Sequence, residues 1–182
     1  MVLNAYMNYR IAKRTKKVQK ALQRMKEHEP EWDEEKLIKF SKDRFMYIQN
    51  LKGMHKLEGL REVLAYKFYL GWEKEIEKQI KKSERYSFSE LEILDAFIVD
   101  FKNYLNDNND IFTVCFDAVA NDQTLRKGKV VLENYSDFRE FWTFRKQAGE
   151  WKLFEITQAN GWEKFIDGKL VFEKLKKKHN TH

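Results

Sequence analysis

The spacing of apolar positions divides the chain into a helix-forming first half and a strand-forming second half. Over about residues 4–28, apolar side chains recur at intervals of four and seven, which predicts an amphipathic helix with a narrow apolar stripe. The stripe consists of Leu3, Met7, Ile11, Val18, Leu22 and Met25, and Arg14 interrupts it. Pro30 then ends the helix, because proline lacks an amide hydrogen and disfavours helix in the residue before it.

Helical spacing resumes after this proline. Asp33 is a predicted N-cap for a helix over residues 33–50, and Gly53 marks the end of that segment. Two further helices are predicted over residues 57–64 and 66–82. All three carry an apolar side that must pack against another element.

From Ser87 onward the period changes to two, which is the period of a β-strand. The predicted strands lie near residues 88–103, 111–121, 136–147 and 150–158, with a polar connection over residues 121–134. The last two strands form a hairpin around the break Gln147-Ala148-Gly149-Glu150. Helices first and strands second predict an α+β fold, in which helices cover the concave face of a curved four-stranded antiparallel sheet.

Aromatic residues concentrate on one side of the third strand, where Phe138, Trp142 and Phe144 share a face. The candidate residues of a hydrophobic pocket are Phe116, Trp142, Phe144, Trp151 and Leu153. These side chains either fill the core between sheet and helices, or line a cavity for an acyl chain or for a partner's hydrophobic segment. The sequence alone leaves both interpretations open.

Charge separates the first helix from the rest of the chain. Residues 1–26 hold eight basic residues and no acidic one, which leaves 27 Lys and Arg against 29 Asp and Glu elsewhere. We therefore divide the chain into a basic helical arm (1–29), an α+β domain (30–160) and a basic tail (161–182) that is either a final helix or a second contact surface. The cations expected to contact a membrane are Arg10, Lys13, Arg14, Lys16, Lys17, Lys20, Arg24 and Lys26.

Three kinds of partner are considered for this arm. A basic amphipathic helix suits an anionic membrane surface, while its apolar stripe suits pairing with another helix in a homo-oligomer. Binding to nucleic acid or to a ribosome is the third alternative, and we do not favour it because the arm lacks the interleaved aromatic residues of single-strand binders. No run of about eighteen apolar residues is present, so we expect no segment that spans a bilayer.

Catalytic and metal chemistry find little support. The four histidines have no ligand-like spacing and Cys115 is the only cysteine, so we expect neither a metal nor a cofactor. The carboxylates on predicted strands are Asp95, Asp100, Asp117, Glu140 and Glu155, and no histidine accompanies them there. We predict that the protein is not an enzyme, with a ligand-binding or catalytic cone-shaped domain as the alternative.

Several segments resemble one known family. Glu140-Phe141-Trp142-Thr143-Phe144, followed by Trp151-Lys152-Leu153, is similar to the C-terminal domain of subunit 44 of the mitochondrial translocase of the inner membrane. Trp72-Glu73-Lys74-Glu75-Ile76 and Leu91-Glu92-Ile93-Leu94-Asp95-Ala96 extend the resemblance to about residues 32–158. It implies a cone-shaped fold like that of nuclear transport factor 2, an apolar pocket and no catalytic residues.

The resemblance also implies a place in the cell and a role. It indicates a non-catalytic, membrane-peripheral scaffold on the bacterial inner membrane or on the matrix side of the mitochondrial one. We expect its partners to be an anionic membrane surface and another protein. The sequence does not contain the long N-terminal region through which the mitochondrial protein recruits its chaperone, so we do not carry over a role in an import motor.

Overall fold

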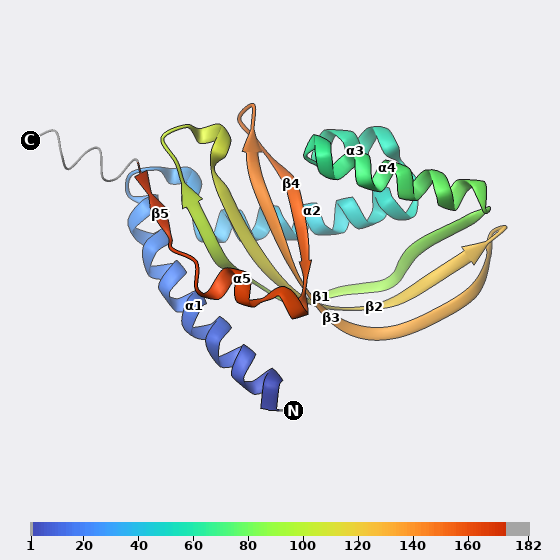
Figure 1. Ribbon diagram of the computed structural model, residues 1–182, viewed down its shortest axis with the longest axis horizontal. Coiled ribbons are helices and arrows are strands. Elements are labelled where there is room, and N and C mark those ends of the chain that lie inside the picture. Colours follow the sequence, from blue (N-terminus) through green and yellow to red (C-terminus); the bar gives the residue numbers. More distant parts are fainter. Residues whose placement is uncertain (1, 174–182) are drawn as a thin grey trace, which may run out of the picture.

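The computed structural model describes residues 2–173, in which four helices come first and the strands of one curled sheet follow (Figure 1). The helices are α1 (Val2–Lys26), α2 (Glu34–Gly53), α3 (Leu57–Val63) and α4 (Tyr66–Lys81). The Asp33 carboxylate accepts hydrogen bonds from the backbone amides of Glu35 and Lys36, at 3.1 and 3.3 Å, and so caps α2 as predicted. The predicted α+β class and the helices at 33–50 and 66–82 are confirmed.

The sheet has the strand order β4-β3-β2-β1-β5. Its strands are β1 (Glu84–Asn103), β2 (Ile111–Arg126), β3 (Lys129–Gln147), β4 (Glu150–Gln158) and β5 (Val171–Phe172). The first four pair antiparallel, as predicted. The two-residue β5 was not predicted, and it lies parallel to β1 with Val171 opposite Lys102. A tail helix, α5 (Glu163–Ile166), precedes it, and the basic run 176–178 lies outside the described residues.

The predicted polar connection over residues 121–134 is wrong. β2 continues to Arg126 and β3 begins at Lys129, so the two strands meet in a two-residue turn. Lys127 and Gly128 have φ values of 50° and 78°, and two positive φ angles in succession are typical of the type I′ turn that suits hairpin twist. The ribbon that β1, β2 and β3 form here projects beyond the body (Figure 1). Both faces of this ribbon are open to solvent, so its residues do not alternate between apolar and polar as those of a half-buried strand do.

The main core lies on the concave face of the sheet, beneath α2, α3 and α4. Its fully buried rings include Trp32, Phe45, Phe112, Phe116, Trp142 and Phe144. Val18, Leu22 and Met25 of α1 belong to the same cluster. The second half of α1 is therefore part of the body.

A second, smaller core lies on the opposite face of the sheet. Val99, Cys115 and Phe141 point outward there and are covered by α1 and by the tail. The covering side chains are Ile11, Trp162, Phe165 and Ile166. Ile11, Val18, Leu22 and Met25 of the α1 stripe are thus buried in these two cores, so this part of the helix packs against the body and does not project as a separate arm.

Candidate functional site

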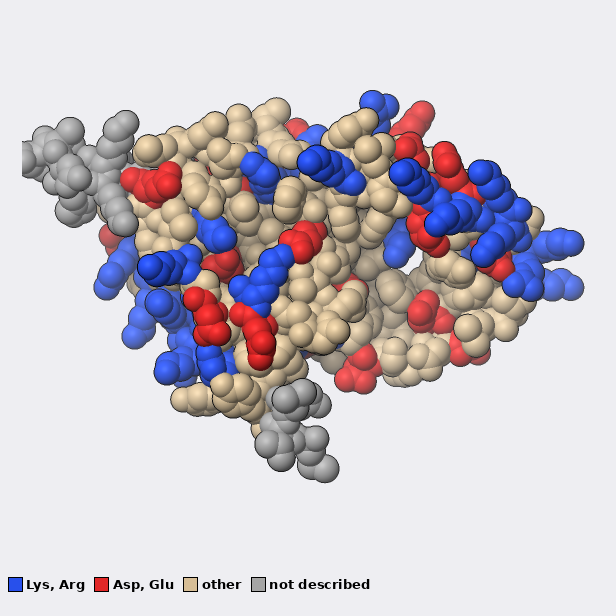
Figure 2. Space-filling view, in the orientation of Figure 1, with Lys and Arg blue, Asp and Glu red and all other residues tan. Residues whose placement is uncertain are grey.

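The outward face of α1 is a continuous basic surface. Because an α-helix turns by about 100° per residue, the side opposite Val18 brings cations from three successive turns together. The exposed cations of this face are Lys13, Lys16, Lys17, Lys20 and Arg24, and Tyr6 and Tyr9, 50 and 64 % exposed, continue it toward the amino end. Figure 2 shows blue side chains gathered over α1, in the lower left of the view. We call these five cations and two tyrosines the α1 basic face.

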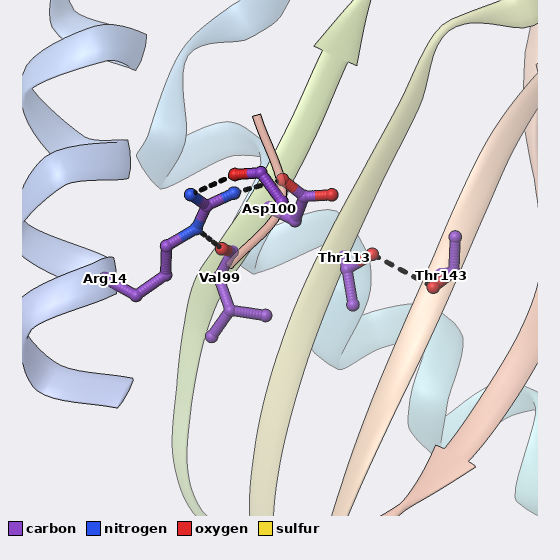
Figure 3. A network of polar contacts seen from close by, with 6 residues as sticks. Arg14, Val99, Asp100, Thr113 and Thr143 are labelled. Atoms are coloured by element: carbon purple, nitrogen blue, oxygen red, sulfur yellow. Dashed lines mark hydrogen bonds and ion pairs between the residues drawn. The ribbon is translucent and has the colours of Figure 1, made fainter. Parts of the chain in front are cut away.

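Arg14, which we had grouped with the membrane-binding cations, lies on the opposite side of the helix and is 4 % exposed. Its guanidinium donates from Nε to the Val99 carbonyl oxygen at 2.8 Å, and from Nη2 to Asp100 Oδ1 at 2.5 Å (Figure 3). A third bond runs from Nη1 to the Gly168 carbonyl oxygen at 2.7 Å. Burial raises the pKa of the Asp100 carboxyl, and the charge of Arg14 opposes that shift. Arg14 therefore holds α1 to the sheet and contributes nothing to the surface.

Two more of the predicted cations are engaged in ion pairs. Arg10 Nη2 lies 2.6 Å from Asp167 Oδ1, and Lys26 Nζ lies 2.7 Å from Asp33 Oδ2. The hydrogen bond to Asp33 raises the pKa of Lys26. Both residues are at the margin of the α1 basic face, where they fasten the helix to neighbouring segments and keep part of their charge in solvent.

The predicted pocket residues form a packed aromatic cluster. Phe116, Trp142, Phe144 and Leu153 are fully buried, and Trp151 is half-buried. The ring of Phe45 from α2 lies against them, with its centroid 4.6 Å from that of Phe116 and 4.7 Å from that of Trp142. Trp151 packs edge-on against Trp32 and Phe112. Of the two interpretations left open by the sequence, the structure favours the core, because protein rings occupy the space in which a ligand would lie.

Three of the predicted strand carboxylates, Asp117, Glu140 and Glu155, accept hydrogen bonds from side chains of the sheet or of α5. Both oxygens of Asp117 accept hydrogen bonds from Arg139, at 2.5 and 2.6 Å, and this contact raises the pKa of the guanidinium. Glu140 accepts from the indole nitrogen of Trp142 at 2.9 Å. Glu155 pairs with Lys164 at 2.6 Å. These bonds are the ordinary means of satisfying half-buried acids, whereas Asp95 is exposed and accepts a hydrogen bond from the backbone amide of Ala96 at 2.8 Å.

A hollow that the sequence did not indicate opens between the end of α2 and the projecting ribbon. It has a volume of about 380 Å³ and is lined by Gln49, Lys52, Gly53, Tyr86, Ser87, Phe88, Asp122 and Thr124. The Lys52 ammonium lies 4.7 Å from the centroid of the Trp72 ring, and burial lowers the pKa of Lys52. No sequence signal could find this site, since its walls come from three segments that are 33 and 34 residues apart along the chain, as from Gly53 to Tyr86 and from Phe88 to Asp122.

Residues 2–173 contain neither a candidate metal site nor a helix that could span a membrane. This part of the chain holds no group of three or more His, Cys, Asp or Glu side chains placed to bind a metal ion. Each helix in it is too short or too polar to cross a bilayer.

Comparison with known proteins agrees with this architecture. Among solved structures, the intermembrane space region of the chloroplast protein ARC6 aligns with a TM-score of 0.50 at 12 % identity, over 66 % of this chain and 95 % of that one. At that identity the match shows a shared fold alone. Curated protein sequences give no match. The model of the Tim44-like domain family matches residues 18–158, beginning inside α1 and ending with β4, and the chain therefore belongs to the Tim44-like domain family.

Proposed function

We propose that this domain is a non-catalytic, membrane-peripheral scaffold that docks on an anionic bilayer through the α1 basic face. One observation carries the proposal: five exposed cations line one side of a helix that has no acidic residue before Glu27, while the other side is fixed to the body. A rigid basic surface of this kind suits the negative surface potential of a membrane. Tyr6 and Tyr9 suit the headgroup region, where tyrosine is enriched.

The expected interaction is electrostatic. Each Lys or Arg near acidic lipid contributes ~1 kcal/mol, so five contribute several kcal/mol, enough for reversible association. Ile11, Val18, Leu22 and Met25 add nothing to this interaction while they are buried in the two cores. Because exposed charges are screened over ~8–10 Å at physiological ionic strength, binding should fall steeply as salt is added.

The test is pelleting with vesicles of phosphatidylcholine, with and without phosphatidylglycerol. The variant Lys13→Gln/Lys17→Gln/Lys20→Gln/Arg24→Gln removes four charges from the α1 basic face and keeps good helix formers. The matched control is Lys36→Gln/Lys56→Gln/Lys67→Gln/Lys74→Gln, which neutralises four exposed lysines, on α2, at the N-cap of α3 and on α4. We expect the first variant to lose most of its binding to anionic vesicles and the control to keep it.

Two results would count against the proposal. Equal binding to vesicles with and without phosphatidylglycerol would remove its electrostatic basis. Tighter and charge-dependent binding to RNA or DNA, measured beside the vesicles, would instead support the nucleic-acid alternative.

Our finer expectation is a pocket for an acyl chain or a partner's hydrophobic segment. The aromatic cluster has no open space for either, and the mostly polar hollow beside Lys52 suits a partner segment that presents polar groups together with an apolar side chain. The cluster is closed by Phe45, whereas the hollow is open and has Phe88 in its wall. We therefore place a partner segment at the hollow. Substituting Phe88→Ser should weaken capture of such a segment and leave vesicle binding by α1 unchanged.

A further inference from the structure

The free end of the projecting ribbon is built from two segments that are far apart in the sequence. The backbone amide of Lys127, in the β2–β3 turn, donates to the carbonyl oxygen of Ser83, just after α4, at 2.9 Å. Arg126 Nη2 lies 2.6 Å from Glu84 Oε1 and ties the same two segments together. The end of α4 and the hairpin turn thus form one defined surface, which we call the ribbon tip.

The ribbon tip is strongly basic. Its exposed cations are Lys81, Lys82, Arg85, Lys127 and Lys129. Figure 2 shows blue side chains gathered at the right end of the molecule, and Figure 1 places α1 at the left, so the two basic surfaces lie toward opposite ends of the longest axis. The sequence hid this surface, because residues 27–182 carry a net charge of −2 when they are counted together.

Exposed aliphatic side chains accompany these cations. Val130, Val131 and Leu132 are 47, 53 and 64 % exposed, and Ile80 at the end of α4 is 54 % exposed. Three consecutive apolar residues on a strand point to both of its faces in turn, so neither face of this strand end is covered. A run of exposed apolar side chains like this one marks a site of contact with a membrane or with another protein.

The position of the run in the sheet makes this contact more specific. In the sheet of residues 2–173, β4 pairs with β3 only from Glu140 onward, which leaves the first part of β3 as an edge. Edge strands of this kind are normally protected by charge. Here Lys127 and Lys129 stand next to the aliphatic run, and their charges oppose edge-to-edge pairing between two copies of the chain.

We infer that the ribbon tip is a second lipid-contacting surface, which enters the headgroup region of an anionic bilayer with Val131 and Leu132 while the surrounding cations lie on lipid phosphates. A narrow, protruding hairpin can enter an interface without rearrangement of the body. Exposed aliphatic side chains at a projecting end suit a bilayer interface, and the exposed Tyr86, in the same cross-strand row as Leu132, suits the headgroup region where tyrosine is enriched. This site lies outside the α1 basic face and does not depend on it.

The lone cysteine permits a direct test. Cys115 is fully buried, so a thiol-reactive environment-sensitive dye can be directed to Val131→Cys in the native protein. The matched control is Leu105→Cys, at a position that is 54 % exposed and lies in the β1–β2 connection. With vesicles that contain phosphatidylglycerol, the dye at position 131 should shift to shorter wavelength and brighten, and the control should not change.

Charge and apolar variants separate the two contributions. Lys127→Asn/Lys129→Gln removes two charges, and asparagine tolerates the positive φ of that turn position. Val131→Thr/Leu132→Thr removes the aliphatic groups and keeps strand-forming residues. Each pair should raise the lipid concentration needed for half-maximal pelleting by roughly fivefold or more.

The outcomes distinguish this inference from the proposed role of α1. If the α1 variant with four Gln substitutions still shows the spectral shift at position 131, the ribbon tip binds lipid independently, and this result stands even if α1 itself fails to bind. An unchanged spectrum at position 131 with anionic vesicles would overturn the inference. A dimer in the absence of lipid that Val131→Thr/Leu132→Thr dissociates would assign the edge to a second copy and would also overturn it.

Discussion

Arg14 of α1 forms a buried ion pair with Asp100 of β1, at 2.5 Å, and the two side chains are only 3 and 10 % exposed. The pair closes the seam between the first helix and the outer face of the sheet. In the sequence Arg14 interrupts the apolar stripe of α1. In the structure its hydrogen bonds to Val99 and Asp100 attach that side of α1 to β1. The position of the α1 basic face, and with it the proposed membrane contact, depends on this attachment.

Removal of the cation from this pair should destabilise the fold. Arg14→Met leaves the Asp100 carboxylate buried without its counter-charge, and breaking a buried pair in this way costs ~3–5 kcal/mol in the free energy of unfolding. Urea denaturation followed by tryptophan fluorescence measures the loss. The control Lys17→Met, on the exposed side of the same helix, should change the free energy of unfolding by only a few tenths of a kcal/mol. A loss below about 1 kcal/mol in Arg14→Met would contradict the structural role of the pair.

The same variant should show a characteristic dependence on pH. Burial already raises the pKa of Asp100 in the folded protein, and the loss of Arg14 removes the charge that opposes this rise. A carboxyl group whose folded pKa exceeds its unfolded value contributes stability below the unfolded pKa and loses it as the pH rises through the folded pKa. The destabilisation of Arg14→Met should therefore be smaller near about pH 4.5 than near about pH 8, as measured by urea titrations at both values. A destabilisation of equal size at the two pH values would mean that Asp100 is not the group left unpaired.

Truncation of α1 on its buried side should affect the body as a whole. Leu22 is 1 % exposed in the main core, so Leu22→Ala should cost ~2–5 kcal/mol. Gln23→Ala, at the neighbouring exposed position, serves as the control. A cooperative loss of stability seen by both tryptophan fluorescence and circular dichroism is expected, whereas a separate arm would melt without affecting the tryptophan signal.

The aromatic cluster gives a further stability prediction. Trp142 is fully buried against Phe45, Phe116 and Phe144, and Trp142→Ala should cost ~3–5 kcal/mol in the free energy of unfolding. Thermal or urea unfolding provides the measurement. A variant that keeps its stability within a few tenths of a kcal/mol would show that space at this position is open, as in the ligand-pocket interpretation.

Cys115 should be unreactive in the native protein. Burial raises the pKa of its thiol far above the usual value, so almost no thiolate forms at neutral pH. Modification by an aromatic disulfide reagent should proceed at the rate of opening of the fold and should accelerate in Leu22→Ala and Trp142→Ala. Rapid modification of the native wild-type protein would contradict the packing of Phe141 and Phe165 over this face.

The elements that the sequence predicted well are those with one apolar and one polar side. Helices over residues 33–50 and 66–82 and the hairpin around Ala148-Gly149 each show their period clearly, and the structure contains them. Residues 121–134 are predicted as a polar connection because solvent reaches both faces of the ribbon there and the alternation that identifies a strand is lost, whereas the β1 part of the ribbon from residue 88 is predicted as a strand. Gly128 is the one residue in this connection whose type indicates the β2–β3 turn.

Candidate sites were predictable only where their residues lie close together in the sequence. The charge of α1 was visible in the sequence because its cations all fall within residues 10–26 with no acidic residue among them. The contacts of Arg14 were not visible, since Asp100 and Gly168 lie 86 and 154 residues away. The ribbon tip and the hollow beside Lys52 were missed for the same reason. Each is assembled by the curl of the sheet from segments whose local charge and hydropathy are unremarkable.

The contacts between α1 and the tail also impose an order on folding. The partners of Arg10 and Arg14 at residues 167 and 168 follow them by 157 and 154 positions, so α1 leaves the ribosome long before the segment that covers the outer core with it. During that interval Ile11 and its neighbours have no tail to pack against, and closing so long a loop is the slow step of a fold rich in distant contacts. Until residues 162–168 have been synthesised, the nascent chain therefore lacks the segment that covers Ile11 on the outer face of the sheet, whereas Val18, Leu22 and Met25 need only the main core for their burial.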